Sequence, residues 1–319
     1  MYLKYLGETK AIRLIMKNIQ RRCSEIRLGI GDDACLLKDG TILTTDSFLE
    51  GVHFDLKYFD YQTLGERIAC ATLSDIAAMA GKPILILAAL YLPKEMTTKE
   101  LLSLYQGIEN ICRRYNCEIG GGDIVSSKRL GITLSALGKT DKPVLRSGAR
   151  PKDRVFVTGY LGLAETGRKT MNIKSGYRNS RARHLRPLPR IKEAWQLRTR
   201  LNSLIDTSDG LATDVNHLAR ESGVKIKIFW DKLPIHPETI KLCRKRHWAI
   251  ERFVLSSGED FELLFTTQKE MPKTIQGLKI SEIGICEKGR GVFLIKEGGK
   301  EYPCPPIGYD HLWSRSISF

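Results

Sequence analysis

TTDSFLEGVHF, residues 44–54, begins at the end of an apolar segment and brings two hydroxyls, a carbonyl and a carboxylate together at Thr44, Thr45 and Asp46. Hard oxygen atoms are the ligands that Mg²⁺ prefers, usually one or two carboxylates together with phosphate and water. The stretch therefore predicts a strand that ends at a magnesium site, and the other ligands should be aspartates at similar positions.

Five further segments place acidic residues beside glycines, at turns, in a helix or at a helix start. They are residues 29–33 (GIGDD), Asp75 in LSDIAAM, residues 120–123 (GGGD), 206–210 (DTSDG) and 256–260 (SSGED). Taken singly, most have an ordinary explanation, such as a helix cap, a plain turn or a flexible loop. Asp75 does not, because a carboxylate among apolar helix neighbours is costly to bury without a partner. Six segments of one kind together favour a shared metal centre.

The common phosphate-binding motifs are missing, since the sequence has no G-x-x-x-x-G-K-[ST] loop and no H-R-D or D-F-G set. Phosphoryl transfer to an anionic acceptor brings like charges together, at a cost on the order of 4 kcal/mol per close charge pair. Metal ions between the phosphates are the direct remedy. Glycines 120–122, expected just after a strand that ends at Ile119, would let backbone N–H groups approach phosphate. A helix over residues 207–222 would offer its N-terminus to phosphate in the same way.

The chain of 319 residues is predicted to form two domains, which we place at 1–140 and 141–319. The segment 139–153 is rich in charge, glycine and proline, as expected of a boundary. Apolar periodicity predicts a helix over residues 63–80, and the apolar run 84–92 predicts a buried strand. Both halves mix strands and helices, so each is predicted to be α+β.

The net charge of +15 is concentrated in residues 168–200, which contain eleven lysines and arginines and one acid, a local excess of +10. Two interpretations stay open, a solvated loop or a basic surface that gathers phosphorylated substrates. Nucleic acid is a disfavoured partner because Tyr177 and Trp195 form no stacking-platform pattern there. No apolar run approaches the ~20 residues of a membrane span, so we expect no membrane segment and a cytoplasmic location. None of the eight cysteines forms a C-x-x-C pair, which favours buried thiols over a zinc site.

Nine motifs in order resemble the thiamine-monophosphate kinase family over nearly the whole chain. They are GIGDDA (29–34), TTDSFLEGVHF (44–54), LSDIAAM (73–79), GGD (121–123), RSGA (146–149), RHLRPLPRI (183–191), DTSDGLATD (206–214), SSGEDFELLF (256–265) and GYDH (308–311). The resemblance implies the two-domain α+β fold of aminoimidazole ribonucleotide synthetase. In that fold the N-terminal domains of two subunits pair into a barrel-like sheet, and a C-terminal α/β sandwich covers the site.

The resemblance also implies the reaction, in which ATP and thiamine phosphate give ADP and thiamine diphosphate by direct transfer in a homodimer with several Mg²⁺ ions per site. No general base is needed, because the acceptor oxygen is already anionic at neutral pH. Positions that match the family's magnesium ligands are Asp33, Thr44, Thr45, Asp46, Asp75, Asp123, Asp206 and Asp209, of which Asp46, Asp75, Asp123 and Asp209 are also expected to be catalytic. Positions that match ATP contacts are Tyr105, Gly122, Asp123, Arg146 and Ser208, and those that match thiamine phosphate contacts are His53, Glu259 and Tyr309.

Two departures from the family pattern bear on this interpretation. Residues 162–164 (GLA) stand where the family usually carries Gly-Asp-Ser, which puts a polar contribution from that loop in doubt, and residues 169–183 are unusually basic for a segment that is commonly helical. Selenophosphate and aminoimidazole ribonucleotide synthetases are the closest alternatives, but they usually carry a reactive Cys or Lys in a glycine-rich N-terminal segment. A catalytically weak paralogue is a further alternative, although every motif aspartate is present.

Overall fold

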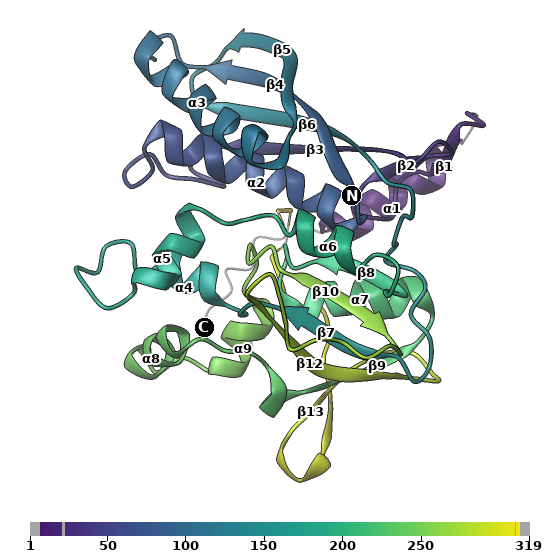
Figure 1. The fold of residues 1–319 in the computed structure, drawn as a ribbon. Helices are drawn as coiled ribbons and strands as arrows, with labels where there is room; N and C mark the ends of the chain where they lie inside the picture. Colours follow the sequence, from purple (N-terminus) through teal and green to yellow (C-terminus); the bar gives the residue numbers. More distant parts are fainter. Residues whose placement is uncertain (1–6, 21–22, 310, 313–319) are drawn as a thin grey trace.

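A computed structural model describes residues 7–20, 23–309 and 311–312 of the chain. In this part of the chain the strands form two separate sheets, one from residues 26–139 and the other from residues 154–303. Helices lie between and around the sheets (Figure 1). This arrangement confirms the predicted α+β class.

The first sheet has the strand order β1-β2-β3-β6-β4-β5 within the described residues. Its strands are β1 (Ile26–Leu28), β2 (Cys35–Leu37), β3 (Thr41–Leu49), β4 (Lys82–Leu92), β5 (Glu118–Ser126) and β6 (Gly131–Lys139). Neighbouring strands are antiparallel except β4 and β5, which run parallel because helix α3 (Thr98–Tyr115) connects them.

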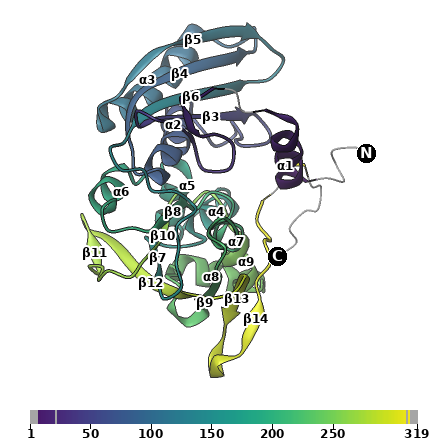
Figure 2. The ribbon, with the colours of Figure 1, turned by 90° about the vertical axis from the view of Figure 1, so that its right-hand side faces the viewer.

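The two faces of the first sheet differ. On β3, Thr44 and Asp46 point to the inner, partly buried face, whereas Thr45 points to the outer, exposed face. The outer face carries exposed apolar side chains, among them Leu43, Leu49, Leu87, Tyr91 and Val125. Helices of the described chain lie on the inner side of this sheet (Figure 2).

Helix α2 (Tyr61–Ala78) joins the two sheets and lies close to the predicted helix 63–80. It begins at Asp60, whose carboxylate accepts a hydrogen bond from the Thr63 N–H at 2.7 Å. It contacts α3, β3 and β6 on one side and, on the other, α6 (Ile191–Leu197) and β8 (Ser203–Asp206) of the second half. The helix is therefore buried on almost every side, which explains its apolar sequence and places Asp75 at the junction between the two sheets.

The second sheet has the order β14-β13-β9-β12-β7-β10-β8, with β11 paired to β12. Its strands are β7 (Arg154–Thr158), β8 (Ser203–Asp206), β9 (Lys225–Phe229), β10 (Leu263–Thr267), β11 (Thr274–Ile275), β12 (Leu278–Glu287), β13 (Gly291–Ile295) and β14 (Glu301–Pro303). The other α-helices are α1 (Glu8–Asn18), α4 (Leu163–Lys169), α5 (Arg178–Leu185), α6 (Ile191–Leu197), α7 (Leu211–Ser222), α8 (Pro237–Arg246) and α9 (Ile250–Ser256).

One apolar core extends across the junction between the sheets. Leu73 and Ile76 of α2 belong to the same buried cluster as Phe156 and Phe265 of the second sheet. Close packing in this shared core fixes the position of α2 relative to the second sheet, and with it the aspartates at the junction. Across residues 7–20, 23–309 and 311–312, no helix combines the length and the apolar composition that a bilayer crossing requires.

Candidate functional site

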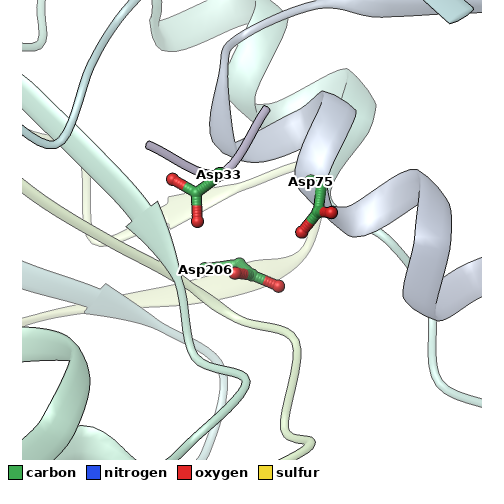
Figure 3. A group of neighbouring side chains, drawn as sticks. All are labelled: Asp33, Asp75 and Asp206. Atoms are coloured by element: carbon green, nitrogen blue, oxygen red, sulfur yellow. The ribbon is translucent and has the colours of Figure 1, made fainter. Parts of the chain in front are cut away.

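Three of the predicted aspartates converge at the junction of the two sheets. Asp33 comes from the loop before β2, Asp75 from the last turn of α2 and Asp206 from the end of β8. One carboxylate oxygen from each lies within 4.8 Å of the corresponding oxygens of the other two (Figure 3). Segments far apart in the sequence therefore build one acidic centre.

The electrostatics of this centre favour a bound cation. Burial raises the pKa of Asp206 to about 7, and the charge of Asp33 adds to the rise. Burial also raises the pKa of Asp75 well above its ordinary value, with Asp46 and Asp206 adding to it. Oδ2 of Asp33 and Oδ1 of Asp206 are buried and lack a hydrogen-bond partner among the described residues. Carboxylates placed in this way repel one another unless a proton or a metal ion joins them, so the donor set fits a hard divalent cation such as Mg²⁺.

Hydroxyl groups fix the orientation of two of these carboxylates. The Thr44 hydroxyl donates to Oδ2 of Asp75 at 2.5 Å, and the Ser74 hydroxyl donates to Oδ2 of Asp206 at 2.5 Å. Asp46 faces the same inner side of the sheet, and burial raises its pKa. The structure thus brings Thr44 and Asp46 to the centre with Asp75, as their pattern in the sequence predicts.

Arg146 ties the acidic loop to the segment between the sheets. Its guanidinium nitrogen Nη2 lies 2.7 Å from Oδ1 of Asp33, and its main-chain N–H donates to Oδ2 of Asp32 at 3.1 Å. Burial raises the pKa of Asp32 to about 7, and the charge of Asp33 contributes. Asp32 is not among the predicted ligand positions, although the sequence shows it as a carboxylate next to Asp33 in the same glycine-flanked turn.

Residues 207–210 form a loop, and the predicted helix begins only at Leu211. Gly210 has φ 113°, and a Cβ atom there would lie 2.8 Å from the main chain of Ser256, so the helix cannot start earlier. The charge of Asp209 contributes to the raised pKa of Asp206, behind the larger effect of burial. Ser208 accepts a hydrogen bond through its carbonyl from the Glu259 N–H at 2.8 Å. Asp209 and Ser208 therefore lie beside the acidic centre, on a loop rather than on a helix.

The residues predicted to contact thiamine phosphate form a second group at the same junction. The ring of His53 lies 4.8 Å from that of His311, which lies 4.7 Å from that of Tyr309. The Tyr309 N–H donates to the Asp209 carbonyl at 3.1 Å, so this segment lies on the aspartate loop. Burial lowers the pKa of His53, His311 lowers it further, and Glu259 acts in the opposite direction. His53, Glu259 and Tyr309 are therefore neighbours in the fold.

Comparison with known proteins shows to which family this chain belongs. The model of the AIR synthase related protein, N-terminal domain, matches residues 31–140. Thiamine-monophosphate kinase of Aquifex aeolicus is 37% identical over 320 residues, covering 98% of this chain and all of the relative. The chain belongs to the thiamine-monophosphate kinase family. The Bacillus subtilis member is 34% identical, covering 91% of this chain and 94% of its own. The solved structure of AaThiL complexed with AMPPCP and TMP superposes with a TM-score of 0.86 at 36% identity, covering 98% of this chain and 99% of that one.

The remaining ligand positions taken from the thiamine-monophosphate kinase family lie elsewhere in this chain. The Thr45 hydroxyl accepts a hydrogen bond from Ser135 at 3.0 Å on the outer face of the first sheet. Asp123 lies in edge strand β5 beside Ala89, also on the outer face, and β6 and β4 separate β5 from β3. Three strand spacings put it about 14 Å from the row of Asp46. Tyr105 is half-buried on α3. The single chain therefore does not unite the whole predicted set.

The glycine run before Asp123 belongs to β5, which continues to Ser126 and does not end at Ile119 as predicted. A Cβ atom at Gly122 would lie 1.8 Å from the Ala88 carbonyl oxygen of the adjacent strand. Glycine is required there by strand packing, which is a reason independent of phosphate binding.

The departure from the family pattern at residues 162–164 has a structural explanation. The buried carboxylate of Asp260 accepts hydrogen bonds from the main-chain N–H groups of Gly162 at 2.5 Å and Ala164 at 2.8 Å. The Asp260 carboxylate thus provides hydrogen-bond acceptors for the main-chain N–H groups at the start of α4, and no polar side chain is needed at Leu163.

Two arginines of the basic stretch are internal, whereas six of its eleven lysines and arginines are exposed. Arg183 and Arg190 form ion pairs with Glu262, whose side chain is fully buried, and Thr158 donates to the same carboxylate at 2.6 Å. Arg186 lies 2.8 Å from Glu66 of α2. Arg186 therefore links α2 of the first half to the segment after α5, and the exposed lysines and arginines fit either interpretation of the stretch.

A cavity of about 1130 Å³ lies at the other end of the first sheet. It is lined by the start of β4, the start of β5 and Trp195. None of the converging aspartates lines it, so we place the site by its chemistry and not by cavity size.

Proposed function

We propose that the chain transfers the terminal phosphoryl group of ATP directly to thiamine phosphate, giving ADP and thiamine diphosphate. The observation that carries this proposal is the convergence of Asp33, Asp75 and Asp206. Buried carboxylates with unsatisfied oxygens suit divalent cations, and a relative that covers 98% of this chain has been solved complexed with AMPPCP and TMP. No strongly basic group is required, because a phosphate acceptor is already ionised at neutral pH.

We assign the metal to the inner face of the first sheet. Asp33, Asp75 and Asp206 would hold Mg²⁺, with Asp46, Asp209 and the hydroxyl of Thr44 beside them. When bound, Mg²⁺ supplies positive charge that reduces repulsion between donor and acceptor phosphates. The chain's own contribution is orientation, because Ser74 and Thr44 fix the carboxylates before any ligand arrives.

ATP and the acceptor would contact two different sets of residues around this centre. Arg146 and Ser208 are proposed to contact the nucleotide, together with Tyr105 and Gly122. His53, Glu259 and Tyr309 are proposed to contact thiamine phosphate, and their position beside the Asp209 loop supports this. The acceptor phosphate would then lie next to the aspartates and its rings next to the aromatic side chains.

We propose a homodimer that pairs the outer faces of two N-terminal sheets. That face carries exposed Leu43, Leu87 and Tyr91, which a second copy would cover. Thr45 and Asp123 also lie on this face, so a role for Asp123 in catalysis would depend on the second copy. We further propose a division into domains 1–140 and 141–319, and a cytoplasmic location.

Acceptor-dependent release of ADP tests this function. The protein is incubated with ATP and Mg²⁺ and with thiamine phosphate, with thiamine or without acceptor, and thiamine diphosphate is measured by chromatography. We expect ADP and thiamine diphosphate in equal amounts, and only in the reaction that contains thiamine phosphate. ADP release that is the same in all three reactions would contradict the proposal.

A further inference from the structure

Arg67 is a buried cation in the middle of α2 that the family motifs do not include. Its side chain is only 4% exposed, although an arginine keeps its charge under all ordinary conditions. A buried charge without a counterion is costly, so its ion-pair partner is informative. Among the described residues, Glu259 is the one acidic side chain that forms an ion pair with it, at 2.7 Å between NH2 and Oε2.

This pair spans the junction between the two halves of the chain. Arg67 comes from α2 of the first half, and Glu259 comes from the loop between α9 and β10 of the second. A second nitrogen of Arg67, NH1, donates to the main-chain carbonyl of His184 on α5. The guanidinium group is thereby held from two sides, and its position does not depend on Glu259 alone.

Glu259 has an unusual backbone for a glutamate. Its φ is 63°, in the left-handed region, and its N–H donates to the Ser208 carbonyl at 2.8 Å. Buried carboxylates anchor the residues that follow. Asp260 accepts a hydrogen bond from the main chain at the start of α4, and Glu262 forms ion pairs with Arg183 and Arg190. The loop is thus rigid, while the Glu259 side chain itself is 40% exposed and faces the same junction as His53.

We infer that Arg67 is a positioning residue for the acceptor: it binds Oε2 of Glu259 and so directs Oε1 toward an N–H donor or cationic ring of thiamine phosphate. This inference rests on the proposed function. A carboxylate held at one oxygen loses less rotational freedom when a ligand binds the other. Arg67 itself need not touch the acceptor.

The test is a double-mutant cycle on the acceptor KM. Arg67→Met, Glu259→Gln and the double variant are compared with the wild type by Mg²⁺-dependent thiamine diphosphate formation. We expect Arg67→Met to raise the KM for thiamine phosphate by roughly ten-fold, with the KM for ATP and kcat changed less than about two-fold. The double variant should be no worse than Glu259→Gln alone, because Arg67 acts through that side chain.

Arg67→Lys and Arg113→Met complete the design. Lysine retains the charge and should recover part of the acceptor affinity, which a purely structural role of α2 would not require. Arg113 lies on α3, is 71% exposed and pairs with Glu109, so Arg113→Met is the matched control and should leave both KM values unchanged. If Arg67→Met does not fold, Arg67→Lys and Glu259→Gln still form a cycle.

Additive effects in the cycle, or an equal rise in both KM values, would overturn the inference. The inference would also be overturned if the wild type forms thiamine diphosphate and the Arg67→Met variant has an unchanged acceptor KM. That result would leave the proposed function intact. A wild type that shows no acceptor-dependent ADP release would overturn the proposed function, and the inference with it.

Discussion

Arg146 and Asp33 are 113 positions apart in the sequence, yet a guanidinium nitrogen of one lies 2.7 Å from a carboxylate oxygen of the other. Their side chains are 19% and 1% exposed. Arg146 lies in the segment between the sheets and Asp33 lies in the loop before β2, so the pair fixes the acidic centre to the segment that leads into the second half of the chain. It also places one fixed cation beside carboxylates that repel one another.

Arg146→Met should therefore lower the melting temperature more in the absence of Mg²⁺ than in its presence. Without the arginine, Asp33 keeps a buried charge that only a proton or a metal ion can neutralise, and loss of one partner of a buried pair costs about 3–5 kcal/mol. Thermal unfolding with EDTA and with excess Mg²⁺ measures the difference. Exposed Arg150, changed to Met, is the control and should behave as the wild type. An equal loss of stability in both conditions would show that the arginine does not share the role of the metal.

The raised pKa values of aspartates in the acidic centre predict that a rise in pH lowers the stability of the fold and that Mg²⁺ raises it. The pKa of Asp206 and of Asp32 is about 7 in the fold, whereas an unfolded aspartate has its ordinary value near 3.8. Between these values the folded protein binds more protons than the unfolded one, so without metal its stability should fall as the pH rises from about 4 to 7. Mg²⁺ replaces the protons and should remove this decline.

Differential scanning fluorimetry at pH 5 and pH 8 tests this linkage. Mg²⁺ should raise the melting temperature strongly at pH 8 and little at pH 5, because protons compete for the same oxygens at the lower pH. Asp206→Asn should weaken the response at pH 8. A metal effect of the same size at both pH values would mean that the ion binds elsewhere.

Asp46→Asn should reduce turnover on the order of 100-fold or more while leaving the fold intact. The amide keeps the shape of the side chain on the inner face of β3 but removes the charge next to Asp75. Steady-state assays at saturating Mg²⁺, with circular dichroism as a check of folding, measure it. Asp39→Asn changes an exposed acid in the turn before the same strand and should retain full activity. Near-normal turnover of Asp46→Asn would remove it from the site.

Local patterns were enough to predict the parts of the acidic centre but not its geometry. Asp75 was identified because an acid is costly among apolar helix neighbours, and Asp206 because it ends a strand that runs into a predicted helix start. The fold confirms that these two converge with Asp33. Which face of the sheet a residue occupies depends on strand register, which no local pattern fixed, and so Asp123 and Thr45 were grouped with residues of the opposite face.

Long-range pairing was the main information that the sequence did not reveal. Residues 120–122 were expected to follow a strand that ends at Ile119 and to let backbone N–H groups approach phosphate, but the close approach of Ala88 explains these glycines as part of β5. Arg183 was assigned to a solvated or substrate-gathering surface because its neighbours are charged. Its partner Glu262 is 79 positions away, and only the fold shows that their charges cancel in the interior.

Arg183→Met should consequently destabilise the protein, and Arg178→Met should not. Glu262 is fully buried and would lose one of its two arginines, at a cost of about 3 kcal/mol, whereas Arg178 is exposed at the start of α5. Urea unfolding of the two variants, which make the same chemical change five residues apart, measures the contrast. If both lose equal stability, Glu262 is not the reason. A fall in kcat/KM for Arg178→Met at low salt would instead restore a substrate-gathering role for the exposed arginines.

Tyr309→Ala should raise the KM for thiamine phosphate several-fold and leave the KM for ATP almost unchanged. The tyrosine is 50% exposed, and its ring packs against His311, which in turn lies against His53. Its main chain is held independently of the ring, because its N–H donates to the Asp209 carbonyl and the Gly308 N–H donates to the Thr213 hydroxyl at 2.9 Å. Alanine keeps these main-chain bonds, so the variant removes the aromatic face and little else. An aromatic face against a cationic thiazolium ring contributes about 0.5–2 kcal/mol, which corresponds to a change of a few-fold to some thirty-fold. Tyr309→Phe keeps that face and should stay close to the wild type, and an equal weakening of both KM values by Tyr309→Ala would show that the segment only supports the aspartate loop.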